Sequence, residues 1–167
     1  DGGKVDLGML APGQQKDFGF KAVATGVYRL PVNVDYHMLV FTPVQGQVWS
    51  VMTDLTAMKG YLNFFKPPKN TRLYFEVPAG TEDVKLEVTG YPGEDVSAVL
   101  CDSSGNAVAK YKNFDGPRLF KGRKNGKTAE IWSILISQAA EDVQIRFIEP
   151  LAPVFADSPG NLLIMKN

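Results

Sequence analysis

The clearest pattern of hydrophobic and polar positions lies in residues 72–110. In residues 72–77, and again in residues 83–89, apolar and polar side chains alternate one by one. Successive side chains of a β-strand point to opposite faces of a sheet, so this alternation predicts strands with one buried face. Two further apolar segments follow, and the whole stretch therefore predicts four consecutive strands.

The breaks between these segments fall at residues 78–80, 90–93 and 102–106, which are rich in Pro, Gly, Asp, Ser and Asn. These residue types favour tight turns. The same alternation of short apolar runs and turn residues extends over most of the chain. It predicts an all-β protein, an antiparallel β-sandwich of the jelly-roll kind with at most one short helix.

Other segments extend this pattern on the N-terminal side. Further strands are expected at residues 5–10, 17–22, 27–34, 37–42, 47–52 and 61–65. The one helix candidate is residues 53–59, with Thr53 or Asp54 as N-cap and Gly60 after its end.

On the C-terminal side, residues 111–126 are rich in Gly, Lys, Arg and Asn and predict an exposed loop with a short segment, Arg118-Leu119-Phe120, inside it. Residues 128–137 are apolar on both faces, which is typical of a central strand covered on both sides. Residues 143–149 alternate again and predict the last strand. Residues 151–167 are expected to be a tail or linker, which either packs back on the domain or leads to a neighbouring one.

The length of 167 residues predicts a single domain, residues 1–167, with a possible sub-boundary at residues 66–70. Lys and Arg equal Asp and Glu, 18 against 18, so the net charge gives no support for a nucleic-acid partner. No apolar run is long enough for a membrane-spanning helix, and no membrane insertion is expected. The chain begins at Asp1 without a leader, so we expect a processed chain or a piece of a longer one.

Catalytic residues are scarce. His37 and Cys101 are the only histidine and cysteine, and His37 opens an apolar run with no nucleophile-elbow motif in the chain. One residue of each type is too few for a zinc site. Glycoside hydrolysis needs only two carboxylates, but we interpret the acidic residues as solvated and expect no enzyme. The carboxylates available for such a pair are Glu76, Asp83, Glu87, Glu94, Asp95, Glu130, Glu141 and Asp142.

A calcium site is the one cofactor that the sequence leaves open. Asp102 and Asn106 bound a short loop whose oxygen ligands would suit calcium. The same stretch is typical of an ordinary hairpin turn, and we favour that interpretation.

Exposed aromatic rings are the usual carbohydrate platforms. Trp49 and Trp132 stand in register with apolar neighbours and are expected in the core. The better candidates for a ligand surface lie in turns or among basic residues, and they are Tyr91, Tyr111, Phe114, Arg118 and Arg123. A solvated surface loop is the alternative interpretation of this basic, aromatic segment.

The segment LYFEVPAGT, from Leu73 to Thr81, resembles the opening of pre-peptidase C-terminal-like domains, which are small jelly-roll modules of secreted bacterial enzymes. The following strand, the turn at Asp102 and Gly105 and the two last strands fit the same order, so the likeness covers residues 71–150. The chain departs from the family at residues 95–100, where an acidic strand is usual. The resemblance implies a secreted, non-catalytic accessory role.

Three functions are therefore expected, in this order. The first is an accessory module of a larger exported bacterial protein, in the periplasm, on the cell surface or outside the cell, with polysaccharide as its possible ligand. The second is a structural or interaction domain that packs on neighbouring domains of the parent protein. The third is a jelly-roll enzyme acting on glycans with a carboxylate pair.

Overall fold

The computed structural model describes residues 8–9, 11, 13–17, 51–52, 61–64 and 67–164; for 51–52 and 61–64 it describes the backbone alone. The chain divides into two compact units, Asp1–Thr42 and Pro43–Asn167. Within the first unit, the N–H of Gln14 donates to the carbonyl of Ala11 in a turn. The expected helix at residues 53–59 and most of the expected strands before residue 51 lie outside the described residues.

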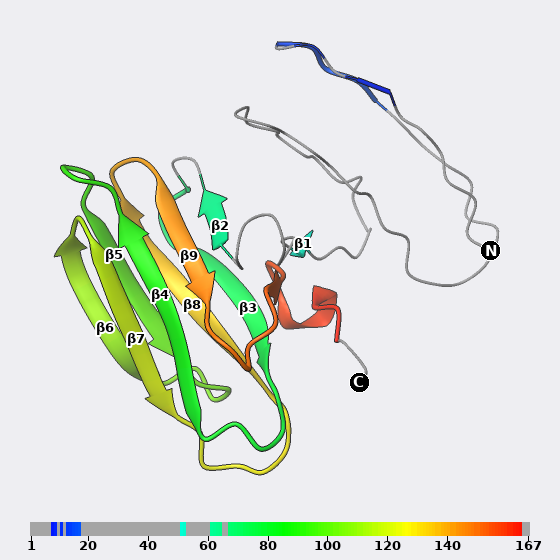
Figure 1. Cartoon of the computed structure of the whole chain (residues 1–167), viewed down its shortest axis with the longest axis vertical. Coiled ribbons are helices and arrows are strands. Elements are labelled where there is room, and N and C mark those ends of the chain that lie inside the picture. Colours follow the sequence, from blue (N-terminus) through cyan, green and yellow to red (C-terminus); the bar gives the residue numbers. More distant parts are fainter. Residues whose placement is uncertain are drawn as a thin grey trace. The chain divides into compact units, whose positions relative to one another are not determined.

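The described part of the second unit is all-β, as predicted, and contains two four-stranded antiparallel sheets and one two-stranded sheet (Figure 1). Its strands are β1 (Val51–Met52), β2 (Tyr61–Phe64), β3 (Thr71–Val77), β4 (Asp83–Gly90), β5 (Val96–Cys101), β6 (Ala107–Phe114), β7 (Pro117–Arg123), β8 (Glu130–Ala139), β9 (Val143–Phe147) and β10 (Val154–Phe155). One sheet has the order β2-β9-β4-β7 and the other β3-β8-β5-β6, while β1 pairs with β10. A short 3₁₀ turn, Pro159–Asn161, follows.

The alternation in the sequence decides which side chains enter the core. In β3, β4 and β9 every second side chain is buried and the residues between them are partly or fully exposed. Trp132, which is 1% exposed, lies in the same core, as its register predicted. The inward side chains of both sheets form one continuous hydrophobic cluster. Burying them is the main stabilising contribution in a sandwich of this kind.

The expected central strand is confirmed as β8, which lies between β3 and β5. Its outer face is covered near one end by the C-terminal segment. Val154, Ala156 and Leu162 form a second buried cluster, against which Ile131 of β8 packs. Ala156 also pairs with Tyr74 of β3 through two backbone hydrogen bonds of 2.8 and 3.0 Å. The segment after β9 thus folds back and closes the β3 edge of its sheet.

The prediction of an exposed loop at residues 111–126 is wrong for most of its length. Residues 107–114 form β6 and residues 117–123 form β7, joined by a tight connection. β6 is an edge of one sheet and β7 is an edge of the other. Edge strands need few apolar residues, because much of their surface remains in water. The polar composition that suggested a loop therefore belongs to two edge strands.

Candidate binding groove

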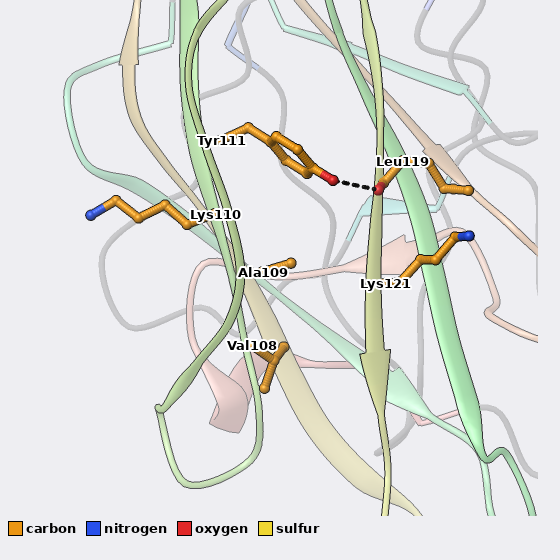
Figure 2. Close-up of a pocket in the computed structure, with 6 residues that line it drawn as sticks. All are labelled: Val108, Ala109, Lys110, Tyr111, Leu119 and Lys121. Atoms are coloured by element: carbon orange, nitrogen blue, oxygen red, sulfur yellow. Dashed lines mark hydrogen bonds between the residues drawn. The ribbon is translucent and has the colours of Figure 1, made fainter.

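An open hollow lies between β6 and β7, where the edges of the two sheets meet. It has a volume of about 580 Å³. Its lining residues are Val108, Ala109, Lys110, Tyr111, Leu119 and Lys121. Figure 2 shows Tyr111 and Ala109 pointing from β6 towards β7, whereas Lys110 and Lys121 point to opposite outer sides. The groove thus has Tyr111 and Ala109 on its inner side and a lysine on each rim, and more of its exposed lining is polar than apolar.

Both strands that form the groove have an open backbone edge. β7 pairs only with β4 in the described sheets. One further hydrogen bond continues this pairing beyond the end of β7, because the N–H of Lys124 donates to the carbonyl of Glu82 at 2.8 Å. Hydrogen-bonding direction alternates along an antiparallel strand. The backbone groups of Leu119 and Lys121 therefore point away from β4 and towards the groove. A hydrogen bond is consistent with this direction of the Leu119 carbonyl, because the Tyr111 hydroxyl of β6 donates to it at 3.4 Å.

Tyr111 joins the two sheets across the groove. Its ring packs edge-to-face on Phe120, with the ring centroids 4.9 Å apart, and on Phe114 at 6.3 Å. The side chain is nevertheless 38% exposed. Such edge-to-face pairs stabilise a ring in one orientation. Tyr111 is therefore a fixed, accessible aromatic surface, as the sequence predicted for an exposed ring.

A β-bulge explains how two aromatic residues three positions apart both point inward. Tyr111 pairs with Ala98 and Phe114 with Val96, so β6 has one more residue than β5 between these pairs. The extra residue is accommodated at Asn113, whose φ is 48°. A bulge of this kind shifts the alternation of side chains by one position.

The bulge is held by a serine of the neighbouring strand. Ser97 Oγ accepts a hydrogen bond from the Asn113 N–H at 3.0 Å and donates to Asn113 Oδ1 at 3.2 Å. Ser137 Oγ in turn donates to the Ser97 carbonyl at 3.0 Å. Ser97 is itself buried, so these bonds satisfy polar groups that would otherwise be costly.

The prediction that Phe114 is an exposed ring is wrong. Phe114 is 3% exposed and belongs to the core cluster. The bulge turns it inward, where Tyr111 and Phe120 pack against it, and the Arg118 guanidinium lies 5.7 Å from its ring centroid. Phe114 supports the groove from below and offers no stacking surface of its own.

The remaining predicted site residues are distributed over two places. Arg118 and Arg123 lie at the two ends of β7 and are exposed, beside the groove. Tyr91 is 40% exposed but lies in the turn after β4 and does not line the groove. The structure thus brings Tyr111, Arg118 and Arg123 to one hairpin and leaves Tyr91 apart.

The hairpin concentrates positive charge that the chain as a whole does not have. Between residues 107 and 127 there is one acidic residue, Asp115, against seven Lys and Arg residues. Lys124 is buried, and its ammonium donates to the Gly126 carbonyl at 2.6 Å. The other six are exposed, and none forms an ion pair with a described carboxylate. These six are Lys110, Lys112, Arg118, Lys121, Arg123 and Lys127.

Sequence reasoning names Lys121 only as part of the basic, aromatic loop and gives no binding role to the lysines of β6. Lys110 ends a predicted strand, and Lys112 lies in the predicted loop. The seven-to-one ratio of basic to acidic residues is visible in the sequence, but only the strand pairing places those residues on two adjoining edges. Pairing depends on residues far apart in the chain, which a local pattern does not contain.

The loop at Asp102 is a hairpin turn. Asp102 Oδ1 accepts hydrogen bonds from the N–H groups of Ser104 at 3.0 Å and Asn106 at 2.8 Å, and Oδ2 accepts one from Asn106 Nδ2 at 3.1 Å. Burial alone would raise the pKa of the Asp102 carboxyl, but the hydrogen bonds from Asn106, Ser104 and Gly105 outweigh it, so this pKa lies below its usual value. Three N–H donors already occupy most of the lone pairs of the Asp102 carboxylate, and the calcium site stays a prediction.

Two of the other carboxylates, those of Glu130 and Glu87, are engaged in structural contacts. Glu130 Oε2 accepts from Trp132 Nε1 at 2.8 Å and from Ser103 Oγ at 2.9 Å, and Glu87 pairs with Arg146 at 3.0 Å. No carboxylate lines the groove. Within the described ranges, no three His, Cys, Asp or Glu side chains come together as metal ligands.

Comparison with known protein sequences gives no family for this chain. No protein-family model matches the chain, and no curated protein sequence matches it significantly. In the described part of the chain, no helix is long and apolar enough to cross a membrane.

Proposed function

We propose that this chain is a non-catalytic accessory module of a larger exported bacterial protein, and that it binds polysaccharide in the groove between β6 and β7. The observation that carries the proposal is Tyr111, a half-exposed ring fixed on two buried aromatic residues in an open groove. Sugar rings pack on such rigid aromatic surfaces with little loss of side-chain entropy. The resemblance of residues 71–150 to jelly-roll modules of secreted enzymes supports the accessory role and the export.

The chemistry of the groove favours binding over catalysis, and the hollow is an open surface groove, not an enclosed cleft. Its lining lacks the paired carboxylates that glycoside hydrolysis requires. A groove of this size would hold a short segment of a chain and leave both ends free.

The proposal is tested by screening the chain on a glycan array and measuring each hit by affinity electrophoresis. We expect Tyr111→Ala to abolish the retardation and Tyr111→Phe to keep it, because the ring and not the hydroxyl makes the stacking surface. Tyr91→Ala is the matched control, since Tyr91 is equally exposed but lies outside the groove. Absence of binding to every glycan, or equal loss with Tyr91→Ala, would overturn the proposal.

A second candidate is suggested by the open backbone edges. Unpaired N–H and C=O groups on β6 and β7 are a template for a strand from a neighbouring domain of the parent protein. Amide hydrogen exchange distinguishes the two candidates. Strand addition in the full-length protein would protect the Leu119 and Lys121 amides, whereas a stacked sugar would leave their exchange nearly unchanged.

A further inference from the structure

We propose, as a step that rests on the proposed function, that the ligand is an anionic polysaccharide whose carboxylate or sulfate groups lie against the lysines on the two rims while one sugar stacks on Tyr111. The proposal starts from the contrast between the whole chain and this hairpin. The formal net charge is +0, yet the six exposed basic residues of the hairpin have no ion-pair partner among the described carboxylates. Charge complementarity therefore selects a negatively charged ligand at this surface.

The rim lysines point away from the groove on its two sides, so they meet the parts of a polymeric ligand that extend beyond Tyr111. Lys110 points outward from β6 and Lys121 outward from β7, with Tyr111 between them (Figure 2). A sugar stacked on the ring would carry its acidic groups towards one rim or the other. Lysine side chains have four-carbon flexible stems, so each ammonium can follow its anion.

The spacing of the basic residues suits a repeating ligand. Lys112 is two residues beyond Lys110 on β6, and Arg123 is two residues beyond Lys121 on β7. Two residues span about 6.7 Å along a strand, so each rim presents positive charges in a row. A single small anion would need convergent donors, whereas a row on each rim fits a polymer that carries charges at intervals.

One cross-strand pair shows that the free protein holds excess positive charge here. Lys121 stands directly opposite Lys85 of β4, and like charges in this position destabilise a sheet. Lys85 has an ion-pair contact with Asp83 of 3.9 Å, and Asp83 itself stands opposite Arg123. The one ion-pair contact here thus joins Asp83 to Lys85, Lys121 has no carboxylate partner, and an anion on the ligand would relieve the repulsion between the two lysines.

Two other roles explain these basic residues less well than an anionic polysaccharide does. They are protection of the sheet edges and binding of nucleic acid. Charged residues on edge strands prevent edge-to-edge aggregation, and this role would suit lysines on β6 and β7. It does not account for an accessible aromatic ring fixed between them. Single-stranded nucleic acid is bound by several stacked aromatic residues in a strongly basic channel. Here one aromatic residue lines the groove and the chain is neutral overall.

The test is affinity electrophoresis of the chain in polygalacturonate, dextran sulfate and neutral dextran, with polyglutamate and single-stranded DNA as further polyanions. We expect retardation by the anionic polysaccharides and none by neutral dextran. Binding should be lost near 1 M NaCl, where the Debye length is about 3 Å. The comparison of polygalacturonate with dextran sulfate tells whether carboxylate or sulfate is preferred.

The variants are Lys110→Gln, Lys121→Gln and the double variant, with Lys69→Gln as the control. Lys69 lies in the turn before β3, at the other edge of the sheet that contains β6. Each groove variant should weaken binding about two- to five-fold, as for exposed ion pairs, and the control should have no effect. The melting temperature of each variant verifies that the fold is intact.

The outcomes separate the two proposals. If neutral dextran retards the chain as strongly as the anionic polysaccharides do, and Tyr111→Ala abolishes this retardation, the charge inference is wrong and the proposed function stands. No retardation by any polysaccharide would overturn both. Stronger binding of polyglutamate or DNA with the same lysine dependence would replace the polysaccharide by another polyanion. Lysine variants that self-associate but bind normally would assign the lysines to edge protection and overturn the inference.

Discussion

The two edges of the sheet β3-β8-β5-β6 are protected in different ways. At the β3 edge the chain itself provides the cover, because Ala156 pairs with Tyr74 and the following segment packs on Ile131. At the β6 edge no described strand pairs, and the exposed residues include Lys110 and Lys112. Covering an edge and charging it both prevent aggregation. Only the second leaves the backbone and side chains accessible, so a ligand groove can exist at β6 and not at β3.

The largest expected effect concerns the side of the sandwich with the open edges. If this side is as well packed as the rest, Phe114→Ala should lower the free energy of unfolding by about 3–5 kcal/mol, because it removes a buried ring that supports Tyr111 and Phe120. Tyr91→Ala is the control and should change it by less than about 0.5 kcal/mol. Urea denaturation measures both. Similar small effects for the two variants would mean that β6 and β7 are loosely packed.

The closed edge should be sensitive to loss of its backbone pairing. Ala156→Pro removes the N–H that donates to Tyr74 and adds volume at a fully buried site, so we expect a loss of about 2–4 kcal/mol. Lys121→Pro at the open edge removes an N–H that points away from β4 and should cost under about 1 kcal/mol. Thermal denaturation of the two variants compares the edges directly, and equal losses would contradict the difference between them.

A glycine on the open side should be the next most sensitive position. A Cβ at Gly122 would lie 2.5 Å from Trp132 Cζ3 and 3.0 Å from a Val108 methyl carbon. Gly122→Ala should therefore destabilise the fold by about 1–3 kcal/mol and alter the Trp132 fluorescence. Gly116→Ala is the control, because no atom lies within 4 Å of its Cβ position. An unchanged emission spectrum and stability would show that β7 can move away from β8 at low cost.

The smallest expected effect is the pH dependence of the turn that leads into β6. The folded-state pKa of Asp102 lies below its ordinary value of 3.8, so the ionised carboxylate stabilises the fold above that pH, and this stabilisation is lost as the pH falls through the folded pKa. Asp102→Ala should cost about 1 kcal/mol at neutral pH and much less in acid, because the protonated side chain no longer accepts the same bonds. Chemical denaturation at the two pH values measures this difference. A cost that does not depend on pH would contradict it.

Much of the fold could be predicted from the sequence because its strands alternate strictly. Side-chain alternation predicts β3, β4 and β9, and the register of Trp132 with Ile134 places its ring in the core. Alternation is a local consequence of strand geometry and requires no knowledge of which strands are neighbours. The turn at Asp102 is predictable for the same reason, since its hydrogen bonds join residues within four positions.

The candidate site could be predicted only in part. Composition points to Tyr111, Arg118 and Arg123, but it also suggests an exposed ring at Phe114 and a loop at residues 111–126. The error at Phe114 comes from the interpretation of residues 111–126 as an exposed loop. Strand alternation would not have corrected it, because the bulge at Asn113, held by Ser97 sixteen residues earlier, shifts the register by one position. The lysines of β6 could not be predicted as rim residues, because the local pattern does not show that β6 lies at the edge of a sheet.

The sequence by itself determined the class of the fold, the inward faces of its main strands and the turns between them, since each of these follows from neighbours along the chain. The tertiary structure decided which edges are open, where the bulge turns the aromatic residues and how the C-terminal segment closes β3. These depend on pairings between distant residues, such as Tyr74 with Ala156 and Lys85 with Lys121. The free energy of such a pairing depends on both strands, so the pattern of either strand alone does not predict it.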